Sequence, residues 1–197
     1  MSEVDGLDYG GGNISSLLRC LARLDIPYRL KTGDDHPDGS RPMMLPGVGA
    51  FGAVMDALEE RGLARSVVEQ TAKDVPLLGV CVGLQILFEE SEESPGARGL
   101  SLLPGSVRKL AAKKVPQIGW NRVTCNENGP LQEGYVYFVN SYVAHPRRVE
   151  DVWYSADYGG EFCAAVRHKH IAAFQFHPEK SGRFGHDLIA DWCKNAV

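Results

Sequence analysis

Short apolar runs alternate with amphipathic stretches along the first half of the chain. Four leucines recur at the core-facing spacing of one helix: Leu17, Leu18, Leu21 and Leu24. Asn13 or Ser15 can cap that helix, and further helices are expected over 53–60 and 82–90. The apolar runs between the helices are predicted strands: 28–31, 43–45 and 75–80. Short strands that alternate with helices imply right-handed crossovers and a mostly parallel sheet.

The second half of the chain has a different pattern, in which apolar runs are separated by turns. These runs are predicted strands: 115–118, 135–139, 152–156, 162–167 and 171–176. One helix, about 182–194, follows them. Residues 2–8, in contrast, are too polar to make a good buried strand. We therefore expect one α/β domain over residues 1–197, whose later part adds antiparallel strands to the sheet.

Composition narrows the function classes. The 197 residues carry a formal net charge of −4, which argues against a general nucleic-acid binder. No apolar span reaches the ~18 residues of a membrane helix, and the first residues lack the basic and apolar regions of a secretory signal. The 5 cysteines are odd in number and form no CxxC pair, which is typical of reduced thiols. We expect a cytoplasmic protein without a disulfide framework or a zinc site.

A candidate nucleophile stands in the segment Gly79-Val80-Cys81-Val82-Gly83, which follows the predicted strand 75–80 and opens a helix. The pattern is typical of a nucleophile elbow with Cys in place of Ser. Small residues two positions before and after the cysteine permit the tight turn that lifts the sulfur to the carboxyl edge of the sheet. The helix N-terminus favours the thiolate. The alternative is an ordinary buried cysteine between packing glycines.

A thiol nucleophile needs a base and a group that orients the base. The segment Phe174-Gln-Phe-His177-Pro-Glu179-Lys-Ser181 offers both near the end of the chain. An extended conformation places His177 and Glu179 on the same side, where the carboxylate can hold the imidazole tautomer. His177 can then accept the cysteine proton and deliver it to a leaving nitrogen. A plain turn is the alternative for this segment.

A glycine-rich loop, Leu45-Pro-Gly47-Val48-Gly49-Ala-Phe51, follows another predicted strand. Such a loop can aim backbone N–H groups at a developing oxyanion, and one such donor is worth roughly 2.7–4 kcal/mol in the transition state. Taken alone, the segment favours a plain strand-to-helix turn.

Together these motifs resemble the glutamine amidotransferases of the Cys-His-Glu triad class, and within that class the glutaminase subunits of imidazole glycerol phosphate synthase. The matching segments occur in the family's order: Asp8-Tyr-Gly-Gly-Gly-Asn13, Leu45-Pro-Gly-Val-Gly-Ala-Phe-Gly52, Gly79-Val-Cys-Val-Gly-Leu-Gln85, Leu87-Phe-Glu-Glu-Ser-Glu-Glu93, Ile118-Gly-Trp-Asn121, Tyr137-Phe-Val-Asn-Ser-Tyr142 and Phe174-Gln-Phe-His-Pro-Glu-Lys-Ser181. The resemblance covers nearly the whole chain.

The resemblance implies a flavodoxin-like sheet flanked by helices and a triad of Cys81, His177 and Glu179. In such enzymes the thiolate attacks the glutamine carboxamide, ammonia departs, and water hydrolyses the glutamyl thioester. The implied oxyanion-hole residues are Gly47, Val48, Gly49 and Val82. The implied residues around the amino-acid end of glutamine are Gln85, Glu93, Ser141 and Tyr142. We expect no metal and no cofactor.

The resemblance also implies a partner, a barrel-shaped cyclase that receives the ammonia in a heterodimer. The cyclase combines it with a phosphoribosyl-aminoimidazole intermediate to give imidazole glycerol phosphate and AICAR. The residues assigned to the partner-facing surface are Asn13, Trp120, Asn121 and Lys180. An oxyanion hole that completes only when the liganded cyclase binds would suppress wasteful hydrolysis.

Two positions depart from the family pattern. Gly11 stands where Met is common, and Asn140 where His is common, beside the expected glutamine pocket.

His168 and His170 suggest metal ligands with His177, but three histidines on one strand face do not close around an ion. We therefore interpret the first two as surface residues. The alternatives are a glutaminase that serves another synthase, a non-enzymatic module on the same fold, and a peptide hydrolase.

Overall fold

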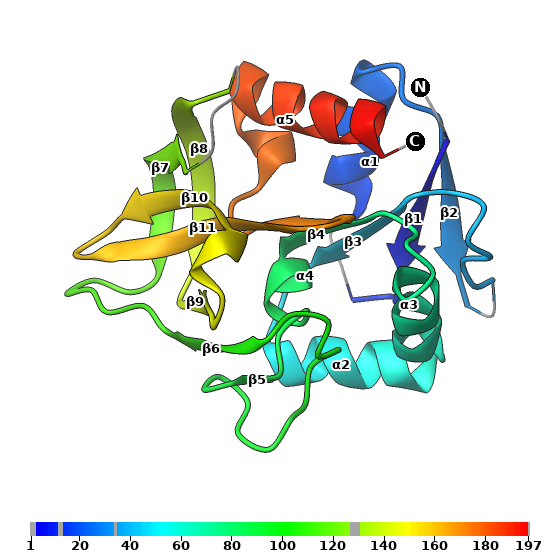
Figure 1. The fold of residues 1–197 in the computed structure, drawn as a ribbon, viewed down its shortest axis with the longest axis horizontal. Helices are drawn as coiled ribbons and strands as arrows, with labels where there is room; N and C mark the ends of the chain where they lie inside the picture. The colour runs from blue at the N-terminus through cyan, green and yellow to red at the C-terminus, as the bar shows by residue number, and fades with distance from the viewer. Residues whose placement is uncertain (1–2, 12–13, 34, 127–130, 197) are drawn as a thin grey trace.

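The computed structural model describes residues 3–11, 14–33, 35–126 and 131–196. Its sheet has the strand order β2-β1-β3-β4-β12-β11-β10-β7-β8, and its first five strands run parallel (Figure 1). These parallel strands are β1 (Val4–Asp8), β2 (Tyr28–Thr32), β3 (Met43–Gly47), β4 (Leu77–Cys81) and β12 (Ile171–Phe174). The expected α/β fold class, with antiparallel strands added to a parallel sheet, is confirmed.

The antiparallel part is built from the second half of the chain. Along the main path it contains β11 (Glu161–His168), β10 (Val152–Asp157), β7 (Gln117–Cys125) and β8 (Glu133–Asn140). A side branch contains β9 (Tyr142–Pro146), β6 (Gly105–Lys109) and β5 (Glu90–Ser91). The β7–β8 hairpin pairs over its full length, from Gln117 opposite Asn140 to Thr124 opposite Glu133.

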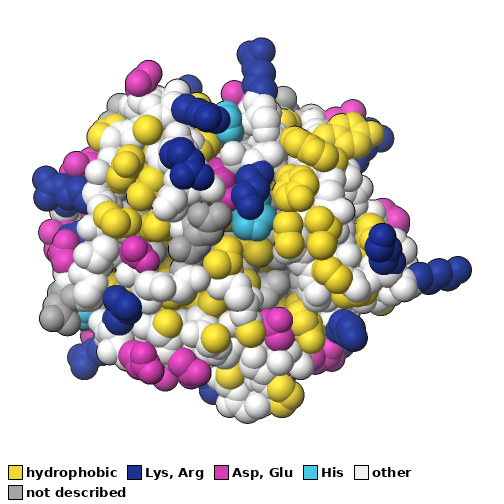
Figure 2. Space-filling model, turned by 180° about the vertical axis from the view of Figure 1, so that it is seen from behind, with side chains coloured by type: hydrophobic (Ala, Val, Ile, Leu, Met, Phe, Trp, Pro, Cys, Tyr) yellow, Lys and Arg dark blue, Asp and Glu magenta, His cyan; other side chains and the backbone are white. Residues whose placement is uncertain are grey.

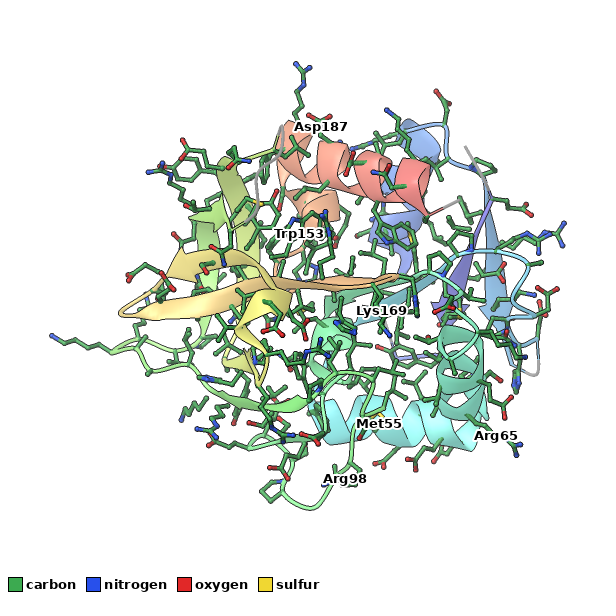
Figure 3. The ribbon with its side chains drawn as sticks, viewed as in Figure 1. Met55, Arg65, Arg98, Trp153, Lys169 and Asp187 are labelled. Carbon is green, nitrogen blue, oxygen red and sulfur yellow. The ribbon has the colours of Figure 1, made fainter. Side chains whose placement is uncertain are left out.

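Helices cover both faces of the sheet (Figure 1). One face carries α1 (Ile14–Arg23) and α5 (Gly182–Asn195); the other carries α2 (Phe51–Glu60), α3 (Leu63–Thr71) and the short α4 (Val82–Gln85). Two 3-10 turns, η1 (Val149–Asp151) and η2 (Pro178–Lys180), complete the elements. Buried Trp153 lies between β10 and α5, and buried Met55 lies on α2 (Figure 3). Within the described ranges, no helix is long and apolar enough to cross a membrane.

Two sequence predictions for the fold are wrong. Residues 4–8 form the buried strand β1 although they read as too polar, because β1 pairs with β2 on one side and β3 on the other. Burial raises the pKa of the Asp5 carboxyl, although Lys31 and Arg41 act in the opposite direction. The helix expected over 82–90 ends at Gln85, because the following backbone groups bond to the 100–105 segment and Glu90 already belongs to β5. The sequence analysis also missed α3, β6 and β9.

Candidate active site

Cys81 stands at a sharp corner between β4 and α4. Its backbone has φ 57° and ψ −112°, a conformation that L side chains rarely adopt. A Cβ on Gly79 would lie 2.6 Å from the carbonyl oxygen of Gly83, and a Cβ on Gly83 would collide with the carbonyl oxygen of Leu45. A Cβ on Gly47 would collide with the backbone of Gly83 in turn. The turn therefore has the geometry of a nucleophile elbow, and its glycines are required by close backbone approach.

His177 and Glu179 meet across a short turn. The Nδ1 atom of His177 lies 2.9 Å from Oε1 of Glu179, and their side chains are only 8% and 5% exposed. The sequence predicted an extended conformation for this segment, and that prediction is wrong. Pro178 opens the 3-10 turn η2, which brings the two side chains together. The carboxylate therefore lies where it can fix the imidazole tautomer and stabilise its charged form.

The β8 strand anchors this turn. His177 donates its backbone N–H to the carbonyl of Tyr137 at 2.9 Å, and Tyr137 donates its own N–H to the Ser181 hydroxyl at 2.9 Å. Ser181 closes the loop by donating to the carbonyl of His177 at 2.6 Å. Sequence reasoning missed Ser181 as a positioning residue, because its role depends on pairing with a strand that lies 44 residues earlier.

The local charges raise the pKa of His177. Burial by itself lowers it, but hydrogen bonds to the Cys81 thiol and the Glu179 carboxylate outweigh burial and raise it to about 9. The imidazole therefore holds its proton at neutral pH between a sulfur and a carboxylate. This is the charge state that stabilises a nearby thiolate and can give a proton to a leaving group.

A chain of two buried amides reaches the thiol. Gln175, fully buried, places Nε2 4.0 Å from the sulfur of Cys81. Gln85 donates from Nε2 to the Oε1 atom of Gln175 at 3.0 Å and to the carbonyl of Tyr142 at 3.2 Å. Its N–H donors are therefore used inside the protein, and its amide braces the pocket wall. Sequence reasoning missed Gln175, although one polar residue between two buried phenylalanines was a signal.

The oxyanion loop lies beside the thiol, and one of its donors is occupied. The backbone N–H of Val48 donates to the hydroxyl of Tyr9 at 3.3 Å. Gly49, the next residue, has φ +106°, which favours glycine. Burial, with Cys81 and Asp8 nearby, raises the pKa of Tyr9 to about 12, so its hydroxyl stays neutral. Tyr9 is a further residue that sequence reasoning missed.

One cavity of about 320 Å³ brings most of the expected residues together. Its lining contains Val48, Gly49, Cys81, Val82, Gln85, Glu93, Pro116, Val139, Asn140, Ser141, Tyr142 and His177. Glu179 and Gly47 are not part of the lining. Glu93 also accepts the backbone N–H of Phe51 at 2.8 Å, which ties the pocket to the start of α2. A volume near 300 Å³ is at the lower end for small-molecule sites and suits a small ligand.

The residues expected at a partner surface differ in their exposure to solvent and in the face of the strand on which they lie. Trp120 is 57% exposed on β7, and Lys180 is exposed on η2. Asn121 lies on the other face of β7, where its side chain donates to the carbonyl of Asp157 at 2.8 Å. Asn13 lies outside the described residues. The exposed apolar neighbours of Trp120 are Ile118, Tyr135 and Val139.

The histidines weighed as metal ligands have other partners. His168 lies 2.9 Å from the Asp151 carboxylate, and His170 lies 3.2 Å from that of Asp74. Their side chains are 19% and 17% exposed, so both lie at the surface but are half-buried, each beside a carboxylate. Among the residues that the structure describes, no group of His, Cys, Asp or Glu side chains is arranged to hold a metal ion.

Comparisons with known proteins identify the family of the chain. The family model "Glutamine amidotransferase class-I" matches residues 6–196. The chain is 40% identical over 198 residues to imidazole glycerol phosphate synthase subunit HisH of Moorella thermoacetica, covering 98% of this chain and 94% of that one. It is 37% identical to the HisH subunit of Dehalococcoides mccartyi, covering 97% and 96%.

Solved structures share the fold at lower identity. A crystal structure of a glutamine amidotransferase superposes with a TM-score of 0.80 at 21% identity, covering 98% of both chains. The structure of PurLQS from Thermotoga maritima gives 0.79 at 14% identity, covering 99% of both chains. The chain belongs to the class-I glutamine amidotransferase family, within the group of HisH subunits of imidazole glycerol phosphate synthase.

Proposed function

We propose that this chain is a glutaminase subunit that hydrolyses L-glutamine through a Cys81 thioester and passes the ammonia to a partner synthase. The observation that carries the proposal is the joint placement of sulfur, imidazole and carboxylate. Cys81 and His177 line one cavity, Cys81 and Glu179 together raise the pKa of His177, and the Nδ1 atom of the ring lies 2.9 Å from Oε1 of Glu179. Membership of the family supports the same chemistry.

The reaction follows from the charges of the triad. The Cys81 thiolate attacks the carboxamide carbon, and backbone N–H groups of the Val48 loop and of Val82 stabilise the oxyanion. As the C–N bond breaks, His177 gives its proton to the nitrogen, which leaves as ammonia. A water then loses a proton to His177 and attacks the thioester, which releases glutamate and restores the sulfur.

The remaining pocket residues favour a free amino acid as substrate. Glu93 places a carboxylate in the cavity wall, which suits the substrate ammonium. Ser141 and Tyr142 line the same cavity and supply polar groups for the carboxylate. A peptide hydrolase needs no charged group at this position, so the pocket supports the glutaminase over that alternative.

The contact between Val48 and Tyr9 supports control of the activity. An N–H that is bonded to a tyrosine hydroxyl does not point at an oxyanion, so the hole is incomplete in the free chain. We infer that docking of the liganded partner turns this peptide toward the substrate. Equal glutaminase rates with and without a liganded partner would refute this inference.

An exposed apolar patch supports a protein partner. The β7–β8 patch consists of Ile118, Trp120, Tyr135 and Val139, which are 63%, 57%, 64% and 38% exposed. Figure 2 shows hydrophobic side chains gathered on the side of the molecule that carries β7 and β8. Aromatic side chains of this kind often dominate binding energy at interfaces. The partner that we propose is a barrel-shaped cyclase, which makes imidazole glycerol phosphate and AICAR in histidine biosynthesis.

Reconstitution tests the proposal. The chain is mixed with a barrel cyclase and its phosphorylated substrate, and glutamate release and cyclised product are measured together. We expect a one-to-one complex in which both products form at equal rates. A glutaminase that serves a different synthase would release glutamate but would not bind this cyclase. A non-enzymatic module would resist alkylation of Cys81 by a glutamine-mimicking electrophile.

A further inference from the structure

Two buried amides lie opposite each other on β7 and β8, and one of them, Asn140, lines the cavity. Gln117 of β7 and Asn140 of β8 form the first register pair of the hairpin, and they are 2% and 5% exposed. The amide oxygen of each is buried and has no hydrogen-bond partner. Buried polar atoms are almost always paired, so two adjacent unpaired acceptors indicate that something with N–H or O–H groups binds there.

The orientation of Asn140 is fixed by its neighbour. Its Nδ2 atom donates to the carbonyl of Tyr142 at 3.2 Å, and a carbonyl can only accept. The free end of the side chain is therefore Oδ1. Asn140 lines the cavity together with Cys81, and the Cys81 thiol contacts the carbonyl of Val139 at 3.9 Å. The unpaired acceptor of Asn140 therefore lies on β8, one residue after the Val139 carbonyl that the thiol contacts.

We propose, on the basis of the proposed glutaminase activity, that Asn140 accepts an N–H group of the nitrogen leaving the substrate, and that Gln117, its register partner outside the cavity lining, accepts an N–H group as the ammonia departs. The carboxamide has two N–H donors, and the nitrogen gains a third proton from His177 as its bond to carbon breaks. Ammonia then leaves with three N–H donors, and the thioester stays on Cys81.

The chemistry of the pair suits this role. Amide side chains accept hydrogen bonds but do not titrate near neutral pH. They therefore bind ammonia without protonating it to ammonium, which would no longer be a nucleophile. Gln117 belongs to β7, the strand that also carries Trp120 of the β7–β8 patch.

The test compares substrates with and without the leaving N–H groups. Two analogues of glutamine lack the carboxamide NH2 group: L-glutamate γ-methyl ester and a diazoketone. Both react at the position of the carboxamide carbon or at the neighbouring carbon. In the complex with cyclase, Asn140→Leu should lower kcat/KM for glutamine about tenfold or more, as for loss of a hydrogen bond to a buried group. Ester hydrolysis and alkylation of Cys81 should change less than about threefold, because these reactions lack the donors.

Two further variants keep the test decisive. Gln117→Met removes the second acceptor without altering the residues that line the cavity, and it should show the same selective loss even where Asn140→Leu does not fold. Asn140→Asp keeps an acceptor oxygen and should retain the preference for the amide over the ester. An equal fall in the rates with glutamine, the ester and the diazoketone would overturn the inference. So would an unchanged kcat/KM for glutamine. A wild-type protein that processes neither substrate would instead contradict the glutaminase itself.

Discussion

The backbone N–H of Val48 is bonded to the hydroxyl of Tyr9 at 3.3 Å, although the same residue lines the cavity that holds the nucleophile. The donor that we propose for the oxyanion is therefore held by the side chain of Tyr9, which directly follows β1. We therefore propose that control of the reaction lies in this peptide unit rather than in the triad, whose His177 and Glu179 are already in contact.

Removal of the Tyr9 hydroxyl tests this relationship. In Tyr9→Phe the Val48 N–H loses its internal acceptor, so the peptide turns toward the cavity more readily. A hydrogen bond of about 1 kcal/mol corresponds to a gain of roughly fivefold. We expect glutamate release by the free chain to rise by about this factor, measured without any partner. A fall in that rate would show that the hydroxyl supports catalysis.

The serine that joins the catalytic turn to β8 should matter for rate and stability. In Ser181→Ala the buried N–H of Tyr137 loses its acceptor, at a cost of about 1–3 kcal/mol. The midpoint temperature of thermal unfolding should fall by roughly 2–4 °C per kcal/mol for a chain of this size. We also expect kcat in the complex to fall about tenfold, because His177 is no longer held in place. Exposed Ser101→Ala is the control and should change neither quantity.

The pKa of His177 predicts a dependence of stability on pH. Its value in the folded protein, about 9, lies above the ordinary 6.5. The protonated ring therefore stabilises the fold fully below pH 6.5, and this contribution is lost as the pH rises through 9.

The measurement is the difference in unfolding free energy between wild type and His177→Gln across that range. We expect the advantage of the wild type to shrink as the pH rises. An advantage that stays constant or grows would show that the ring is neutral in the folded state.

The elbow glycines make a structural prediction with a matched control. Gly83→Ala should destabilise the protein by about 3 kcal/mol or more, because its Cβ would collide with the Leu45 carbonyl. Gly6→Ala adds a Cβ at ordinary contact distance, 3.4 Å from Ile14, and should be neutral or slightly stabilising. Chemical denaturation of both variants measures the difference. Similar losses in both would mean that the elbow tolerates a wider turn.

The local motifs of the site could be predicted from sequence, and its long-range contacts could not. The elbow at Cys81 and the proximity of His177 to Glu179 follow from spacing within a few residues. Tyr9, Gln175 and Ser181 act through partners that lie 39, 94 and 44 residues away, so their roles appear only once the strands are paired. No pattern within those three segments specifies that pairing.

The same limit explains the errors in the fold. Residues 4–8 are polar by composition, yet two neighbouring strands bury them. The apolar run after Cys81 has helical spacing, yet the chain leaves α4 at Gln85 to bond with the 100–105 segment. In both cases tertiary pairing overrides the local preference.

The most direct measurement of the central claim uses Cys81→Ala in the complex with the barrel cyclase. Product formation is followed once with glutamine and once with added ammonium salt as the nitrogen source. We predict that the glutamine-dependent rate falls to background while the ammonia-dependent rate stays at the wild-type value. A joint loss of both rates, or a variant that still uses glutamine, would contradict the assignment of Cys81 as the nucleophile.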